Sequence, residues 1–130
     1  AHLKLKEAYI KAKARDAVST PQVDRRLPVI PVRALRNKAT EDFSRLQVRL
    51  LDEIEQGKIT RTQAQHTLEG FWENRLRDAV VDGDVAYGSL MAGQSVGLVK
   101  SILPVKAIIE ELVSETETEL QKVRQKLMAD

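Results

Sequence analysis

Residues 83–98, GDVAYGSLMAGQSVGL, combine side chains that could contact a ligand with a backbone that carries little bulk. Four glycines, two serines and two alanines fall within these sixteen residues. Met91 offers a soft thioether, Gln94 an amide that donates and accepts hydrogen bonds, and Ser89 a hydroxyl. Such a set suits one wall of a cofactor or substrate pocket.

A helix over residues 87–99 would sort these groups into two stripes. Ser89, Gly93 and Gly97 would follow one another at i, i+4 and i+8, and the backbone along that stripe would be almost bare. Met91 and Gln94 would share a neighbouring face. Two interpretations stay open: Gly93 and Gly97 allow tight helix packing, or the helix walls a pocket. In the second, Ser89 and Gln94 are candidate cofactor contacts, and Met91 and Gln94 candidate substrate contacts.

Other residues with chemical potential are assigned structural roles. We interpret His2 and His66 as surface or capping residues rather than catalytic bases. Asp82 and Asp84 flank a turn after a helix, which favours cap and turn roles over an acid–base pair. The pattern gives Ser89 no histidine partner, which argues against a hydrolytic serine. None of these residues is therefore assigned a catalytic role. We also expect no metal site in this chain, because no His or carboxylate ligands have converging spacing.

The spacing of apolar residues predicts a mainly α chain with at most one short extended segment. Thr60 and Gln63 fit a capping box, and Gly57 and Gly83 fit helix stops. The extended segment is expected within the proline-containing residues 26–35. Helices are expected over residues 2–14, 40–56, 60–82, 87–99 and 104–127.

The 130 residues suffice for one modest domain, which we place over residues 1–130. Residues 1–38 form a basic arm with the extended segment, and residues 39–130 a helical core. Residues 1–40 hold ten Lys and Arg against three Asp and Glu, a net charge of +7. Only five aromatic residues are present, so we expect no nucleic-acid binding. Without a cysteine, an apolar span or a signal peptide, a cytoplasmic protein without membrane contact is expected.

Residues 83–98, followed by PVKAIIEELV, resemble the C-terminal end of the flavin-dependent nitronate monooxygenases, formerly 2-nitropropane dioxygenases, and of the related FMN-dependent enoyl-ACP reductases. Arg33 and Asn37 match a second, upstream segment of that family, and residues 1–13 resemble the stretch after its last phosphate-binding strand. In the main motif the matching residues are Gly83, Asp84, Gly88, Ser89, Met91, Ala92, Gly93, Gln94, Gly97 and Leu98.

This resemblance implies a helical C-terminal subdomain, or fragment, of a (β/α)₈ TIM-barrel flavoenzyme. The parent would be an FMN-dependent oxidoreductase, either a nitronate monooxygenase or an enoyl-ACP reductase. The family's glycine-rich phosphate loops and its catalytic histidine precede the matched part. The resemblance therefore implies that the chain closes the flavin and substrate pocket, while by itself it binds no FMN and is inactive.

The expected partner is the remainder of the barrel. The chain begins inside a basic helical pattern without an initiator methionine, which favours a fragment of a longer protein. Apolar surface meant for the barrel would be exposed, so we also expect a homo-oligomer. The alternative is a stand-alone helical protein-interaction module whose basic arm meets an acidic partner.

Overall fold

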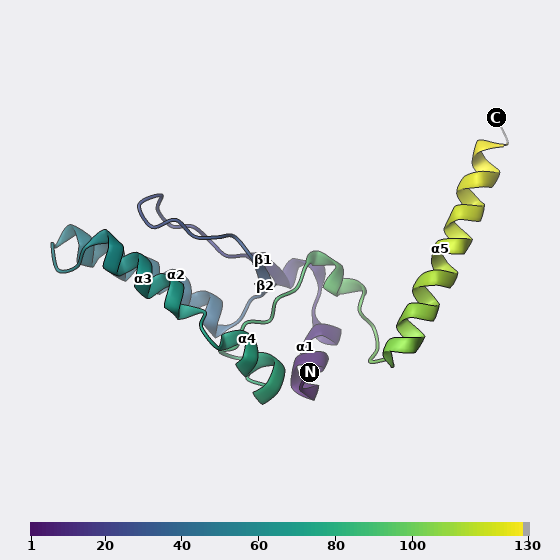
Figure 1. The fold of residues 1–130 in the computed structure, drawn as a ribbon, viewed down its shortest axis with the longest axis horizontal. Helices are drawn as coiled ribbons and strands as arrows, with labels where there is room; N and C mark the ends of the chain where they lie inside the picture. Colours follow the sequence, from purple (N-terminus) through teal and green to yellow (C-terminus); the bar gives the residue numbers. More distant parts are fainter. Residues whose placement is uncertain (129–130) are drawn as a thin grey trace. The chain divides into compact units, whose positions relative to one another are not determined.

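The computed structural model describes residues 1–128, and helices dominate them. The chain divides into two compact units, Ala1–Lys100 and the residues from Ser101 on. The mainly α fold class predicted from the sequence is confirmed. The elements, drawn in Figure 1, are α1 (Leu3–Lys11), β1 (Ala17–Ser19), β2 (Arg33–Leu35), α2 (Lys38–Glu55), α3 (Arg61–Phe71), α4 (Arg75–Arg77) and α5 (Val105–Leu127).

Helices α2 and α3 lie side by side as an antiparallel hairpin (Figure 1). The hairpin turns at Gly57, whose φ of +68° suits a glycine, and α3 begins at the predicted capping box of Thr60 and Gln63. Three aromatic rings pack together at its base, with centroids 5.0–5.1 Å apart: Phe43, Phe71 and Trp72. The core of the hairpin contains Leu27 of the β1–β2 loop together with the buried side chains of the two helices: Phe43, Leu50, Leu51, Ala64 and Leu68.

The loop between β1 and β2 is held against helix α2 by Gln47, a fully buried polar side chain. Its Oε1 accepts a hydrogen bond from the backbone N–H of Val23 at 3.0 Å, and its Nε2 donates to the carbonyl of Pro21 at 3.0 Å. Both ends of the buried amide are therefore satisfied, as burial requires. This loop places Pro28, Val29 and Ile30 beside α3, where they line a cavity described below.

Strands β1 and β2 pair antiparallel, with Ala17 opposite Leu35 and Ser19 opposite Arg33. Strand β2 falls within the extended segment expected at residues 26–35, whereas the sequence analysis does not predict β1. A second core surrounds this pair and joins α1 to the segments that follow α4. Its buried side chains are Leu5, Ala17, Leu35, Ala79, Leu90 and Val96.

The single helix expected over residues 60–82 is wrong, because the chain breaks after α3. Asn74 takes a left-handed conformation with φ of +62°, which an uninterrupted α-helix does not allow. The short helix α4 follows, then a π turn at Asp78–Asp82, and Gly83 ends the run with φ of +73°. The predicted stop at Gly83 is confirmed.

The helix expected over residues 87–99 is also wrong. Residues 87–93 form turns and extended backbone, and only a 3-10 turn at Gln94–Leu98 is helical. Ser89, Gly93 and Gly97 therefore do not line one helix stripe, and Met91 and Gln94 do not share a helix face. The N–H groups of Tyr87 and Gly88 bond to nearby Asp84, but the backbone hydrogen bonds of residues 89–92 go to other parts of the fold.

The glycines of this segment differ in how closely their neighbours approach. A Cβ on Gly88 would lie 2.3 Å from the carbonyl oxygen of Asp84 and 2.7 Å from the Cβ of Ala79, and one on Gly97 would lie 2.8 Å from the backbone nitrogen of Ala14. A Cβ on Gly93 would meet nothing closer than Ser95 Oγ at 3.7 Å. The expectation that close packing keeps Gly93 small is therefore wrong.

The second unit contains helix α5. Pro104 occupies its N-cap position, one residue before the first turn where the sequence analysis places it. Surface ion pairs join Lys106 to Glu110 at 3.8 Å and Lys122 to Glu119 at 2.6 Å. The apolar side chains that repeat along the helix are exposed: Val105, Ile108, Ile109, Leu112, Val113, Leu120, Val123 and Leu127.

We expect Gly88→Ala to lower the free energy of unfolding by about 1–3 kcal/mol, because the added methyl group overpacks a close backbone contact. Gly93→Ala is the matched control, and we expect it to change that free energy by less than about 0.5 kcal/mol. Urea denaturation of the two variants and the wild type measures both. Equal losses for the two variants would show that the packing described around Gly88 is incorrect.

Candidate functional site

The turn at residues 84–88 is built by Asp84. Its Oδ1 accepts hydrogen bonds from the backbone N–H groups of Ala86 at 3.0 Å and Tyr87 at 2.9 Å. The backbone N–H of Gly88 donates to the carbonyl of Asp84 at 3.0 Å. A carboxylate engaged in this way shapes the turn, as the sequence analysis expects. The other member of the acidic pair, Asp82, forms a surface ion pair with Arg77 at 3.0 Å.

Asn37 fixes the same turn from the start of helix α2. Its Oδ1 caps the helix by accepting from the backbone N–H of Thr40 at 3.2 Å. Its Nδ2 donates to the carbonyls of Val85 at 3.1 Å and Gly88 at 2.8 Å. One amide thus joins a helix N-terminus to a turn some fifty residues later in the chain.

Residues 90–92 lie against β2 as a short extended stretch. The backbone N–H of Leu35 donates to the carbonyl of Leu90 at 2.9 Å, and the N–H of Ala92 donates to that of Arg33 at 3.1 Å. Met91 itself pairs with Ala34 in a single antiparallel bridge. Its backbone is therefore fixed by a ladder rather than by a helix.

The carbonyl of Met91 also accepts a hydrogen bond from the Tyr9 hydroxyl of helix α1 at 2.9 Å. Burial raises the pKa of Tyr9, because the charged phenolate loses solvation. A raised folded-state pKa stabilises the neutral phenol, so this contribution is complete below the unfolded pKa. It is lost as the pH rises through the folded pKa.

A cavity of about 390 Å³ opens beside Ser89 and Met91. Ser89 is half-buried, and Met91 is 45% exposed. Gln94 is exposed at the start of its 3-10 turn and is not among the lining residues. Most of the lining is apolar and comes from the β1–β2 loop, from α2 and α3, and from the chain that follows α3: Pro28, Val29, Ile30, Val32, Phe43, Leu68, Trp72 and Leu76, with the polar Gln65 and Glu69.

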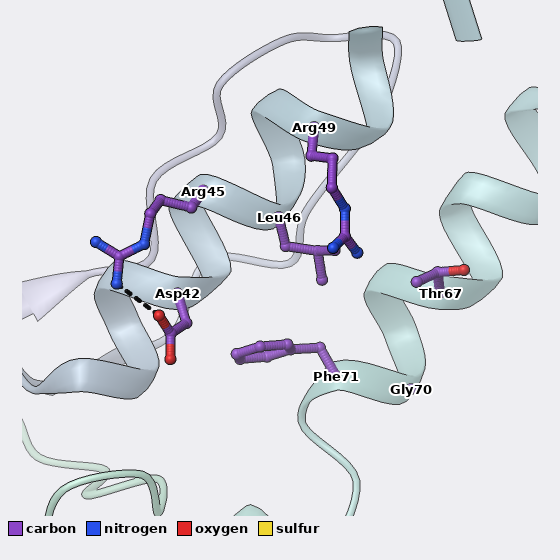
Figure 2. A pocket seen from close by; sticks show the side chains of 7 residues that line it. All are labelled: Asp42, Arg45, Leu46, Arg49, Thr67, Gly70 and Phe71. Atoms are coloured by element: carbon purple, nitrogen blue, oxygen red, sulfur yellow. Dashed lines mark hydrogen bonds and ion pairs between the residues drawn. The ribbon is translucent and has the colours of Figure 1, made fainter. Parts of the chain in front are cut away.

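A second hollow, of about 690 Å³, lies between α2 and α3 and is shown in Figure 2. Leu46 and Phe71 supply its apolar part, and Arg45 and Arg49 project from α2. Arg45 is paired with Asp42 at 2.6 Å, and this bond raises the pKa of the Arg45 guanidinium. Its charge is therefore already balanced by a neighbour on the same helix.

Another exposed charge cluster stabilises the β1–β2 loop. Arg26 donates to Asp24 and to Glu55 of helix α2, each at 3.0 Å. The Arg26 hydrogen bonds lower the pKa of Asp24. The stabilisation is present above the unfolded pKa of that carboxyl and is lost as the pH falls through its folded pKa. These side chains are between 32% and 58% exposed, which suits a structural tie at the surface.

The two histidines occupy positions typical of structural residues. The Nδ1 of His2 accepts a hydrogen bond from the backbone N–H of Lys4 at 3.1 Å and so caps helix α1. His66 is exposed on α3. Within residues 1–128, no three His, Asp or Glu side chains gather in a way that could hold a metal ion. No helix of the described part is long and apolar enough to cross a membrane.

The structure thus brings Ser89 and Met91 to one cavity and leaves Gln94, Gly93 and Gly97 outside it. Tyr9 and Arg75 also hold residues 83–92 in place, and the sequence did not predict this. Neither has a local sequence signal, because each acts on backbone that is distant or irregular. Asn37 was indicated only by the family resemblance.

Comparison with known proteins gives matches among solved structures. FabK from Thermotoga maritima is 36% identical over 95% of this chain, with a TM-score of 0.66. A methionine-to-alanine mutant of the same protein gives 31% identity over 95% of the chain and a TM-score of 0.61. No family model and no curated protein matches.

The chain spans about a third of the length of these structures, 34% and 30% respectively. FabK is a TIM-barrel enzyme, so the chain matches a fragment of such an enzyme. This match supports the resemblance of the sequence to FabK-like and nitronate monooxygenase-like proteins.

Asn37→Asp separates the two roles of Asn37. Aspartate caps a helix as well as asparagine does, but it cannot donate to the carbonyls of Val85 and Gly88. We expect the variant to lose about 1–3 kcal/mol of unfolding free energy, the cost of leaving partly buried acceptors unpaired. Chemical denaturation at neutral pH measures the loss. Wild-type stability would mean that capping is the only role of this side chain.

Proposed function

We propose that the chain is the C-terminal part of an FMN-dependent oxidoreductase and that it closes the pocket shared by the flavin and the substrate. Two findings support this: the family motif over residues 83–98, and the similarity to FabK over 95% of the chain. FabK is a flavin-dependent enoyl-ACP reductase. The observation that carries the proposal is that Ser89 and Met91, both in the motif, line one apolar cavity.

The residues of this chain could form one wall of an FMN pocket, but they do not form a site for the FMN phosphate. Within the described residues, neither strand is followed by a glycine-rich loop that opens a helix, so the FMN phosphate would be held by the remainder of the barrel. Met91 would pack its thioether against the flat ring system or the substrate. Ser89 would offer its hydroxyl, and the exposed Gln94 would stay available to the cofactor or to a loop of the barrel.

When bound, the flavin supplies the hydride and electron chemistry of such an enzyme. The residues of this chain would orient the substrate and exclude water from the cavity. An enoyl thioester reduced with NAD(P)H is the favoured substrate, because both solved structures compared above are FabK. A nitronate is the second candidate within the same group.

In this proposal the remainder of the barrel also covers the exposed apolar side chains of α5. The chain alone then binds no FMN with useful affinity and shows no turnover. A stand-alone interaction module would instead use the apolar face of α5 for a separate partner, and it would need no flavin.

The absorbance spectrum of the purified full-length protein tests the proposal. We expect a yellow protein with visible flavin absorbance that NAD(P)H bleaches anaerobically. An enoyl thioester should then restore the absorbance, because it accepts the electrons of the reduced flavin. A protein that stays colourless after incubation with FMN would contradict the proposal and favour the interaction module. Bleaching of the oxidised flavin by a nitronate, with no recovery of the NAD(P)H-reduced flavin on addition of the enoyl thioester, would reassign the substrate.

Met91→Ala tests the role of the cavity in the full-length enzyme. We expect KM to rise about tenfold or more, since methylene-sized losses from an apolar pocket are worth about 1–3 kcal/mol, while the fold stays intact. Met128→Ala is the matched control, because Met128 is the other methionine of the chain and is 75% exposed.

Steady-state kinetics and thermal unfolding separate the possible roles of Met91. A loss of several kcal/mol in stability, with unaltered kinetics of the folded enzyme, would make Met91 a packing residue. The assignment of this cavity to the substrate would then fail.

A further inference from the structure

Arg75 links the end of helix α3 to the segment that carries Ser89 and Met91. Its Nε donates to the carbonyl of Phe71 at 2.7 Å, and its Nη1 donates to the carbonyl of Tyr87 at 2.7 Å. The guanidinium carbon lies 4.1 Å from the centroid of the Phe71 ring. The backbone carbonyl of Arg75 accepts from the N–H of Ser89 at 2.8 Å. The side chain thus makes two hydrogen bonds and a cation–π contact, and the backbone carbonyl of the same residue holds Ser89.

The break after α3 explains why this side chain is needed. In a continuous helix the carbonyl of Phe71 would accept from the backbone N–H of Arg75, four residues on. The left-handed Asn74 diverts the chain, and that N–H donates to the carbonyl of Trp72 at 3.3 Å instead. The Nε of Arg75 replaces the missing donor. The guanidinium then still has Nη1 to donate to Tyr87.

The residues that Arg75 bonds adjoin two separate segments of the cavity lining. Trp72 and Leu76 flank Arg75 in the chain and line the cavity from the side of α3 and α4. Ser89 and Met91 line it from the motif segment. Among the described residues no carboxylate pairs with Arg75, so its charge serves backbone carbonyls and an aromatic face. A planar fork that bonds in two directions while stacking is a property of arginine that lysine lacks.

We propose that Arg75 is a positioning residue that fixes the spacing between the Trp72–Leu76 wall and the Ser89–Met91 wall of the cavity. It acts through the backbone of residues 87–89 and touches neither substrate nor cofactor. The effect on substrate binding rests on the proposed function, whereas the effect on the conformation of the segment does not.

Hydrogen exchange and steady-state kinetics on the full-length protein test this proposal. Arg75→Gln removes the fork, and Arg77→Gln is the matched control, because Arg77 lies two residues away and makes only a surface pair with Asp82. We expect faster exchange over residues 86–92 in Arg75→Gln, including the Ser89 amide, with unchanged protection of helix α2. Arg77→Gln should match the wild type.

In turnover, Arg75→Gln should raise KM about tenfold, the effect of losing one hydrogen bond of a charged group, with kcat within about twofold of wild type. A merely structural role would lower the folded fraction without this split between KM and kcat. If Arg75→Gln does not fold, Arg75→Lys, which keeps one donor group, takes its place. We expect it to exchange faster than Arg77→Gln over the same residues.

Two exchange results would overturn the assignment of Arg75. One is an exchange profile identical to that of Arg77→Gln, and the other is an increase that spreads equally over α2. A kcat that falls while KM stays constant would likewise contradict it. A full-length protein without flavin or turnover would remove the proposed function, and the exchange comparison would then decide the role of Arg75 by itself.

Discussion

The structure depends on satisfying the backbone polar groups of a segment that forms neither helix nor regular sheet. A buried carbonyl or N–H without a partner costs free energy comparable to a lost hydrogen bond, so residues 83–92 must find partners elsewhere. Asp84 within the segment supplies some of them, and distant parts of the chain supply the others: the phenol of Tyr9, the edge of β2, the start of α2 with the amide of Asn37, and Arg75. These contacts gather the first unit around the segment.

The bareness of the segment follows from this arrangement. At Gly88 the backbone passes so close to Asp84 and Ala79 that a methyl group would collide with them, and a methyl group on Gly97 would lie 2.8 Å from the backbone nitrogen of Ala14. A methyl group on Gly93 would make only an ordinary contact with Ser95, so Gly93 does not take part in this close packing. The spacing of Ser89, Gly93 and Gly97 suggests a helix stripe, but Gly88 and Gly97 make close contacts with separate neighbours and Gly93 makes none.

Local patterns predicted the elements that are stabilised locally. Helices α2 and α5 follow from their apolar periodicity, and the capping box at Thr60 and the stop at Gly83 from residue types alone. The path of residues 87–93 could not be predicted in this way, because the side chains that fix it come from far along the chain. Propensity within a short window carries no information on such partners. The break at Asn74 has the same origin, since Arg75 compensates for it by a tertiary contact.

The sequence predicted the part of the candidate site that depends on residue types, but not the part that depends on contacts between distant segments. The residue types of Ser89 and Met91 suited a pocket wall, and the fold brings both to one cavity. Gln94 was placed beside Met91 by helical spacing, and it lies outside the cavity because that helix does not form. The rest of the lining comes from the loop before β2 and from α2, α3 and the chain around Trp72, which no motif connected to the site.

A crystal structure of the full-length protein with its flavin bound tests most directly whether the non-helical segment places Met91 in the pocket of the flavin and substrate. We expect residues 87–93 to be non-helical and the Met91 side chain to lie within about 4 Å, van der Waals contact, of the flavin or of a bound substrate analogue. A Met91 side chain separated from the flavin and the substrate by another layer of protein, or a continuous helix through residues 87–93, would contradict this expectation.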